Sequence, residues 1–364
     1  MRKIFGNPTP HEEYAEKLDN KGLDKTPEGR AWLAASRAAL EKPVAVSMPY
    51  RQQGFFHADK PRALGLHFSA RGGERLTFTL TRKGDRLPIY ADVFKMGETA
   101  SPLLSADTST TSFSFDADEA GSYILRLQPA LFHTGEYALS VAVGPSLDFP
   151  VSGKNASVGS VWGDTRDGGK RNHEGIDIFA PKRTPAVAAA DGLITGVREG
   201  GIGGKVVWLR PEGKAYTLYY AHLDEQLVHE GQRVKKGDVV GLVGNTGNAR
   251  TTPSHLHFGV YGYGGPIDPL PFVNRIVKTA PSVGDKKLTT QLKLKKAQKN
   301  IDGNIVKAAT YLVPLAADAS GYLAEAPDGS LLQVPFSAVQ VTKETVKKQN
   351  DIAITSAADK AKKS

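Results

Sequence analysis

Histidine and carboxylate residues gather in two short segments of the chain. His173 and Asp177 lie four residues apart in NHEGIDIFAP, and His255 and His257 lie two residues apart in TTPSHLHFGV. In a β-strand, residues two or four positions apart point to the same face, so each pair can face one point. Two histidines and one carboxylate satisfy a catalytic zinc ion and leave its fourth position for water. Zinc lowers the pKa of that water towards about 7, which provides hydroxide near neutral pH.

The choice within the second pair stays open at this point. A site with three protein ligands needs only one of His255 and His257, which leaves the other free as an acid or a base. His222 lies in YTLYYAHL, another strand-like segment of the same Gly-rich region. Tyr219 and Tyr220 in that segment either line a substrate cleft, as substrate-binding residues, or pack in the interior. The chain has no cysteine, so a metal must be held by histidine and carboxylate.

Other interpretations of these segments fit the residues less well. Glu174 follows His173 as in a His-Glu-x-x-His helix, but Gly175 interrupts the motif and Asp177 stands at the second histidine position. The segment GQRVKKGDVVGLVG resembles the hairpin of lipoyl or biotinyl carriers, which need no set of histidines. The segment GLVGNTGNA lacks the Lys-Ser/Thr of a phosphate-binding loop. We expect His229, in the turn-like VHEGQ, to be a solvated residue.

The elements that position these residues are predicted to be mainly β-strands. The chain has 364 residues with 38 Gly and 22 Pro, which favours several domains rich in turns. Residues 1–42 are predicted to form a helical N-terminal extension, with Thr26 capping a helix that begins at Pro27. Residues 43–145 are predicted to form an accessory β-sandwich, because apolar and polar residues alternate in short segments. Those segments are Leu64/Leu66/Phe68, Leu76/Phe78/Leu80, Tyr123/Leu125/Leu127 and Tyr137/Leu139/Val141/Val143. The histidines of this region are expected to be surface or packing residues: His57, His67 and His133.

Three further segments complete a mainly β, multidomain architecture. Residues 146–278 are Gly-rich, again dominated by strands, and contain every residue considered above for metal binding or catalysis. After a lysine-rich linker, residues 284–342 are predicted to form a small SH3-like barrel with a turn at Asp328-Gly329. Residues 343–364 are rich in Lys, Ala and Ser, which predicts a mobile tail.

Residues 155–273 resemble the M23 family of zinc endopeptidases, the lysostaphin and LytM type. The family's His-x-Gly-x-Asp motif matches residues 173–177, its YAHL motif matches 220–223 and its His-x-His motif matches 255–257. GQRVKKGDVVGLVGNTGNA looks like the family's glycine-rich strand and loop. The resemblance implies an antiparallel-β domain of the duplicated hybrid motif type. Ser254 departs from the Gly-Pro that the family more often has before the first histidine, which we expect to affect specificity rather than ligand identity.

The resemblance also implies a role for each residue. One zinc ion would be held by His173, Asp177 and His257. His255 would act as the general base, which takes a proton from the zinc water and delivers it to the leaving amine. His222 would hydrogen-bond the developing oxyanion or the attacking water.

The activity implied is that of a zinc-dependent endopeptidase hydrolysing the peptide cross-links of bacterial peptidoglycan. D-alanyl–diaminopimelate cross-links are expected in preference to glycine bridges. The alternative is a non-catalytic wall-binding regulator that activates a cell-wall amidase; a missing ligand would favour it, and all five family positions are intact. A further hypothesis is latency, in which the N-terminal helices or the β-sandwich cover the zinc cleft.

The charge of the chain is basic, with a net charge of +9 and a pI near 9.4. Much of the excess lies in residues 286–299 and in the tail from Lys343, as either a solvated surface or one attracted to an anionic cell-wall polymer. No nucleic-acid module is present, so no such partner is expected. No stretch reaches the ~20 apolar residues that span a bilayer. We expect an extracytoplasmic protein (periplasmic, outer-membrane-associated or secreted), with Met1 standing where an export signal has been removed.

Overall fold

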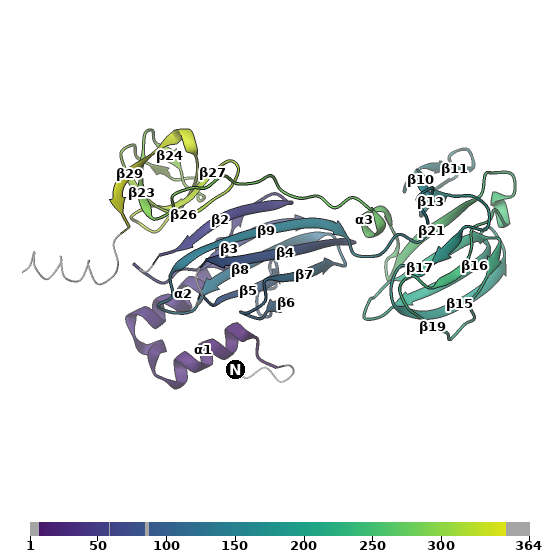
Figure 1. The fold of residues 1–364 in the computed structure, drawn as a ribbon, viewed down its shortest axis with the longest axis horizontal. Coiled ribbons are helices and arrows are strands. Elements are labelled where there is room, and N and C mark those ends of the chain that lie inside the picture. Colours follow the sequence, from purple (N-terminus) through teal and green to yellow (C-terminus); the bar gives the residue numbers. More distant parts are fainter. Residues whose placement is uncertain (1–6, 58, 84–86, 347–364) are drawn as a thin grey trace, which may run out of the picture.

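The computed structural model of the chain describes residues 7–57, 59–83 and 87–346. The molecule is elongated (Figure 1). The domain of residues 157–273 lies at one end, and the N-terminal helices, the sandwich and the C-terminal strands lie together at the other. Strand accounts for 47% of it and helix for 12%, which confirms the prediction of a mainly β protein. None of the described helices is long and apolar enough to cross a membrane.

The N-terminal part of the chain forms helices, as predicted. They are α1 (Pro10–Asn20), the short 3₁₀ turn η1 (Leu23–Lys25) and α2 (Pro27–Glu41). Thr26 caps α2, because its hydroxyl accepts a hydrogen bond from the backbone N–H of Gly29. Trp32 holds α2 against the sandwich: it is buried and donates its indole N–H to the carbonyl of Pro129 at 2.8 Å.

Two sheets of residues 44–145 enclose a common core. The first runs in the order β1 (Val44–Ala45), β3 (Leu64–Ala70), β8 (Gly121–Pro129), β5 (Ile89–Lys95), β6 (Leu104–Ala106). The second contains β2 (Tyr50–Phe56), β9 (Gly135–Pro145), β4 (Glu74–Lys83) and β7 (Ser112–Ala117). The pairings are antiparallel apart from that of β1 with β3. The alternating apolar residues predicted to face the core are buried, and all except Val143 belong to one cluster that includes Leu66, Phe78 and Leu139.

The C-terminal strands continue the second sheet of the sandwich. They are β23 (Thr290–Leu294), β24 (Gln298–Lys299), β25 (Ile305–Val306), β26 (Tyr311–Ala317), β27 (Gly321–Glu325), β28 (Leu331–Pro335) and, after the 3₁₀ turn η4 (Phe336–Ala338), β29 (Val339–Thr345). Strand β26 pairs with β2 through Gln53↔Ala317 and Gly54↔Ala316, so this module is joined edge to edge with the sandwich. Its assignment as an SH3-like barrel stays a prediction. Because β29 continues to Thr345, only residues 347–364 of the predicted mobile tail lie outside the described residues.

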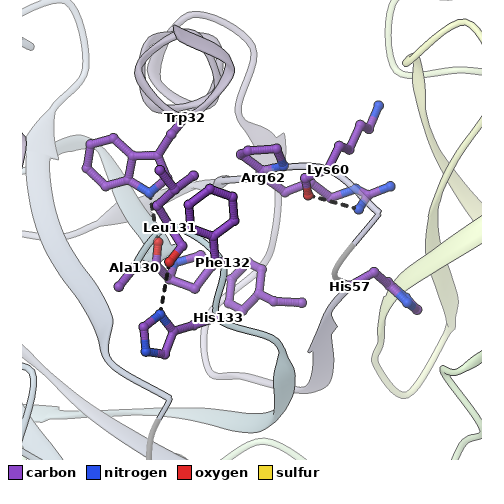
Figure 2. Close-up of a pocket in the computed structure, with 11 residues that line it drawn as sticks. Trp32, His57, Lys60, Arg62, Ala130, Leu131, Phe132 and His133 are labelled. Atoms are coloured by element: carbon purple, nitrogen blue, oxygen red, sulfur yellow. Dashed lines mark hydrogen bonds between the residues drawn. The ribbon is translucent and has the colours of Figure 1, made fainter. Parts of the chain in front are cut away.

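A polar contact reinforces this junction. Arg62 and His57, two of its residues, line the same pocket as Trp32 of α2 (Figure 2). Arg62 is 7% exposed and donates to the carboxylate of Glu325 in β27 at 2.7 Å and to that of Asp59 at 2.8 Å. His57, also buried, donates to the carbonyl of Pro314 at 2.8 Å. His133 donates to the carbonyl of Leu131 at 3.0 Å. His57 and His133 therefore pack and hydrogen-bond to backbone, as expected for histidines without a ligand role.

Residues 157–273 form a separate antiparallel domain. Its larger sheet runs in the order β10 (Ser157–Ser160), β13 (Ile176–Phe179), β21 (His255–Gly262), β17 (Thr217–Leu223), β16 (Gly204–Pro211), β15 (Gly192–Gly200), β19 (Arg233–Val234), with β22 (Gly265–Ile267) beside β21. A smaller sheet contains β14 (Pro185–Val187), β20 (Val239–Leu242) and β18 (Glu225–Gln226). The remaining elements are the hairpin β11 (Thr165–Arg166) and β12 (Arg171–Asn172), the 3₁₀ turns η2 (Asp167–Gly169) and η3 (Gly247–Ala249), and α3 (Leu270–Val273). The core of this domain includes Ile178, Tyr220 and Leu256.

The sandwich and the domain of residues 157–273 pack against each other at α3. Phe272 of α3 is fully buried, and a Cβ atom on Gly73 would lie only 2.3 Å from its ring. Val143 of β9 and Lys278 exchange two backbone hydrogen bonds of 2.9 and 2.7 Å. Lys214 reaches across to Asp118 at 2.8 Å. The domain of residues 157–273 is therefore held against the sandwich by contacts at the segments where the chain enters it and leaves it.

Candidate metal and catalytic site

The register of two strands brings the predicted metal ligands together. Strands β13 and β21 are antiparallel neighbours, and Asp177 lies directly opposite His257. The next pair along the strands, Ile178 and Leu256, is fully buried on the other face. Because successive side chains alternate between faces, Asp177 and His257 must both point away from the core. His173 approaches them from the loop that leads from β12 into β13.

Three ligand atoms converge on one point in this arrangement. Nε2 of His173 lies 3.1 Å from Oδ1 of Asp177 and 3.0 Å from Nδ1 of His257, and the Asp177 and His257 atoms are 3.0 Å apart. A tetrahedral zinc ion with bonds of about 2.0–2.1 Å has its ligands about 3.3 Å apart. Two imidazole nitrogens and one carboxylate oxygen at this spacing fit such an ion.

Contacts around these side chains fix which atoms face the point. Nδ1 of His173 donates to the carbonyl of Val161 at 2.9 Å, so Nε2 is the ring nitrogen that faces Asp177. Oδ2 of Asp177 accepts a 2.8 Å hydrogen bond from Arg166, so Oδ1 faces the histidines. Burial alone raises the pKa of Asp177, but the hydrogen bonds from His173 and His257 outweigh burial and hold that pKa well below its usual value. The carboxylate is therefore ionised and available to a cation.

The two other predicted histidines lie beside this cluster. His255 donates from Nδ1 to the carbonyl of Pro253 at 2.8 Å, and its Nε2 lies 3.9 Å from Oδ1 of Asp177. His222 donates from Nδ1 to the carbonyl of Thr246 at 2.9 Å, and its ring centroid lies 5.1 Å from that of His255. Burial first, and then the neighbouring imidazoles, lowers the pKa of His222 to about 4. Each ring thus uses Nδ1 for the backbone and keeps Nε2 for other partners.

His222 reaches the cluster through an unusual backbone conformation. Along β17, Tyr219 and Ala221 line the cleft while Tyr220 is buried in the core, so alternation would direct His222 into the core as well. The φ angle of His222 is +62°, in the left-handed region that costs a residue with a Cβ atom about 1–2 kcal/mol. This turn brings the ring of His222 into the cleft beside Ala221.

Five residues line one open cleft of about 720 Å³: His173, Asp177, His222, His255 and His257. Tyr219 lines it, which agrees with the first of the two sequence interpretations. Tyr220, the other candidate for substrate binding, does not line the cleft and fits the second interpretation: its side chain is fully buried and its hydroxyl accepts a 3.0 Å hydrogen bond from the backbone N–H of Ala189. Tyr220 is therefore a core residue.

Several residues of the cleft were not identified from the sequence. Arg166 comes from the β11–β12 hairpin, and nothing in its local sequence indicates its contact with Asp177. Trp208 lies beside Tyr219 only because β16 pairs with β17. Tyr261 carries a usable signal, because it follows His257 by four residues in one strand and must share its face.

The described residues of the N-terminal helices and the sandwich do not line this cleft. Among the residues that the structure describes, its lining begins at Ser160 and ends at Tyr261. Ser254, the departure from the family pattern, donates to the carbonyl of Ala180 at 2.7 Å and ties the start of β21 to the end of β13. The cleft is therefore built by one domain.

Comparison with known proteins identifies the family of this domain. Residues 171–269 match peptidase family M23. DD-carboxypeptidase/endopeptidase Mpg of Neisseria meningitidis is 43% identical over 100 residues, which are 28% of this chain and 22% of that protein. L-Ala–D-Glu endopeptidase of Bacillus subtilis is 37% identical over 110 residues, which cover 28% of this chain and 33% of that protein.

A solved structure is also similar to part of the chain. The catalytic domain of lysostaphin from Staphylococcus simulans is 30% identical, with a TM-score of 0.30, and the match covers 32% of this chain and 92% of that domain. The chain spans about a fifth of the length of the first curated relatives that it matches. Residues 171–269, which the family model matches, include the four histidines and the aspartate of the cleft.

Proposed function

Because residues 171–269 belong to peptidase family M23, we propose that this chain is a zinc-dependent endopeptidase that hydrolyses peptide cross-links of bacterial peptidoglycan. The observation that carries the proposal is the convergence of His173 Nε2, Asp177 Oδ1 and His257 Nδ1 within a cleft that also contains two further imidazoles. Mpg, a relative named for DD-carboxypeptidase and endopeptidase activity, supports cross-links that end in D-alanine as the substrate.

The three converging side chains would hold one zinc ion. When bound, zinc supplies a Lewis acid that polarises the scissile carbonyl and lowers the pKa of water. Asp177 brings a negative charge to the cation, and its contacts with Arg166 and the two histidines keep Oδ1 in place.

The remaining histidines would manage protons and charge. Nε2 of His255 accepts a proton from the attacking water, whose oxygen bonds to the carbonyl carbon. When the C–N bond breaks, the same imidazole returns the proton to the leaving amine, so its protonation state is restored. His222, which is neutral and already donates from Nδ1 to Thr246, presents the lone pair of Nε2 and would accept a hydrogen bond from the attacking water.

We further propose the division of the chain and its location. Residues 43–145 would form an accessory sandwich, 146–278 the peptidase domain and 284–342 an SH3-like module that binds wall peptides. A substrate in the cell wall implies an extracytoplasmic location. Retention of wall binding by the full chain after the active site is disabled would support the accessory role.

Hydrolysis of purified muropeptide dimers, followed by mass spectrometry, tests the activity. The zinc-loaded chain is expected to release monomers whose masses identify the scissile bond, and His257→Ala and a chelator are expected to abolish release. Arg198→Met is a matched control, because Arg198 forms an exposed pair with Glu230 outside the cleft. Identical blank traces from the zinc-loaded chain and from His257→Ala would remove the endopeptidase proposal and leave the amidase-activating regulator.

A further inference from the structure

Three aromatic side chains form a continuous wall on one side of the cleft. Trp208, Tyr219 and Tyr261 come from β16, β17 and β21, which lie side by side (Figure 1). The ring centroids are 4.4 Å apart for Trp208 and Tyr219, 5.3 Å for Trp208 and Tyr261, and 5.9 Å for Tyr219 and Tyr261. All three rings line the cleft and are only half-buried. We refer to them as the aromatic wall.

The strand register explains why the rings gather here. Tyr219 is paired with Trp208 on one side and with Gly259 on the other. A Cβ atom on Gly259 would lie 2.7 Å from the ring of Tyr261, so glycine at this position lets that ring lie across the strand. The aromatic wall therefore depends on a residue with no side chain at its centre.

The aromatic wall extends from the proposed reaction centre along the strands. The ring centroids of Tyr219 and His257 are 6.0 Å apart. Tyr261 follows His257 by four residues, or about 13 Å of strand. The ring of Tyr261 lies back over Gly259 and is 5.9 Å from that of Tyr219, so it is at most about 12 Å from the His257 ring, or up to about three residues of extended peptide. A group bound there is not adjacent to the bond that breaks.

Polar and apolar groups border the aromatic wall. Glu174 lines the same cleft, and burial, with a smaller effect of Glu174, raises the pKa of Tyr261 to about 12. Ile202 lies on the rim of the cleft and is 62% exposed. The site thus offers flat apolar faces, a carboxylate that accepts hydrogen bonds and two phenol hydroxyls. A matching ligand has one apolar face and several hydroxyl donors.

Resting on the proposed function, we propose that the aromatic wall is a subsite for a hexopyranose ring of the glycan strand that carries the cross-linked peptides. The stem peptides consist of alanine, glutamate and a diamino acid, none of which has a large flat apolar side chain. A pyranose ring has a C–H face that stacks on an aromatic ring and hydroxyls at its edge. The sugar is also separated from the cross-link by several residues of stem peptide, as is the far end of the wall from His257.

Two substrates that differ only in the sugar test this inference. Cross-linked muropeptide dimers are prepared with their disaccharides and, after removal of the disaccharides, as free peptide dimers. The zinc-loaded full chain is expected to have a kcat/KM about tenfold higher for the sugar-bearing dimer, the size expected of one or two aromatic contacts. Trp208→Leu and Tyr261→Leu are expected to remove this preference, so that each variant has the same kcat/KM for the two dimers.

A binding measurement separates failure of this inference from failure of the proposed function. Dissociation constants of both dimers are measured by calorimetry for the full-length His255→Ala variant, with and without Trp208→Leu. Tighter binding of the sugar-bearing dimer that Trp208→Leu abolishes supports the subsite even if the wild type cleaves neither substrate. Equal affinity for the two dimers overturns it. An equal fall in kcat/KM for both dimers in Trp208→Leu and Tyr261→Leu, with folding intact, also overturns the inference, because the aromatic wall would then bind peptide.

Discussion

Arg166 and Asp177 are joined by a 2.8 Å hydrogen bond between the guanidinium and Oδ2, while Oδ1 of the same carboxylate faces His173 and His257. Arg166 also contacts the hydroxyl of Ser160 and is about a quarter exposed. The two oxygens of Asp177 therefore have different partners: one is held by an arginine from the β11–β12 hairpin, and the other is presented to the proposed zinc site. Arg166 is a positioning residue for a ligand.

Loss of this contact is expected to weaken zinc binding. In Arg166→Met, Oδ2 of Asp177 loses its donor, so the carboxylate can rotate and Oδ1 is no longer held. Zinc affinity is expected to fall about 10- to 100-fold, the range typical of partners of metal ligands. Competition with a chromogenic chelator measures this affinity without any substrate. Arg198→Met, at an exposed pair in the same domain, should leave the affinity unchanged; equal affinities for Arg166→Met and wild type would contradict the role.

Because the backbone at His222 is strained, we expect glycine to be a more stable replacement than alanine there, the reverse of the usual order in a strand. Where φ is positive, glycine is favoured over alanine by about 1 kcal/mol or more, whereas in an ordinary strand glycine is disfavoured by about 0.5–1 kcal/mol. His222→Gly is therefore expected to be more stable than His222→Ala, and both should lose hydrolysis. Comparing two substitutions cancels the loss of the imidazole itself.

Hydrogen exchange of the β17 amides measures the difference, because it reports local free energies in a chain with several domains. The matched control is Leu193 in β15, which is 37% exposed. There, Leu193→Gly should be less stable than Leu193→Ala. The same order at both positions would show that the conformation at His222 is not strained.

The sequence predicted the elements of the site better than their arrangement. Period-two alternation placed Asp177, His255 and His257 on strand faces, and only local geometry is needed for that. It could not decide between His255 and His257, since the answer depends on Asp177 lying opposite His257, a register between strands 80 residues apart. Tyr220 shows the same limit, because neither interpretation could be preferred before the core face of β17 was known.

Long-range contacts account for what was not predicted elsewhere. Arg166 meets Asp177 through a hairpin whose position the surrounding sequence does not specify. The pairing of β26 with β2 joins residues more than 250 positions apart, so the predicted C-terminal module could not be seen to extend the sandwich sheet. Local signals were sufficient for the helix cap at Thr26, where a threonine, a proline and the following helix lie within a few residues.

Arg62 is expected to be essential for the junction of the sandwich with the C-terminal strands. Its guanidinium is buried between Asp59 and Glu325, so Arg62→Met removes the buried cation from both carboxylates and leaves Glu325 only its contact with the half-exposed Lys60. Removal of one partner from a buried ion pair costs about 3–5 kcal/mol. Hydrogen exchange of the β2 and β26 amides should show a loss of this size.

Lys42 provides the control for that change. It pairs with Asp302 at 3.2 Å, but its side chain is 65% exposed. Exposed pairs contribute about 0–1 kcal/mol, so Lys42→Met should change the exchange of the same amides little. Similar losses for Arg62→Met and Lys42→Met would contradict the importance of burial at Arg62.

The docking of the N-terminal helices is expected to weaken in acid because of His11. Its ring is 6% exposed, stacks on Trp32 with centroids 4.8 Å apart, and donates from Nε2 to Oε1 of Gln128 at 2.7 Å. Burial, and then the charge of Arg126, lowers its pKa from 6.5 to about 4, although Gln128, Asp92 and Glu12 oppose this shift.

Between pH 6.5 and pH 4 the unfolded segment binds a proton that the folded one excludes, so stability falls as pH falls through this window and is complete above it. At about 1.4 kcal/mol per pKa unit, the loss approaches about 3 kcal/mol at pH 4. Limited proteolysis of α1 and α2 at pH 7 and pH 4.5 should show faster cleavage in acid. His11→Gln, which can still donate to Gln128 but does not titrate, should remove this acid-induced increase, while the exposed His229→Gln should keep it; an unchanged pH dependence in His11→Gln would assign the effect to another group.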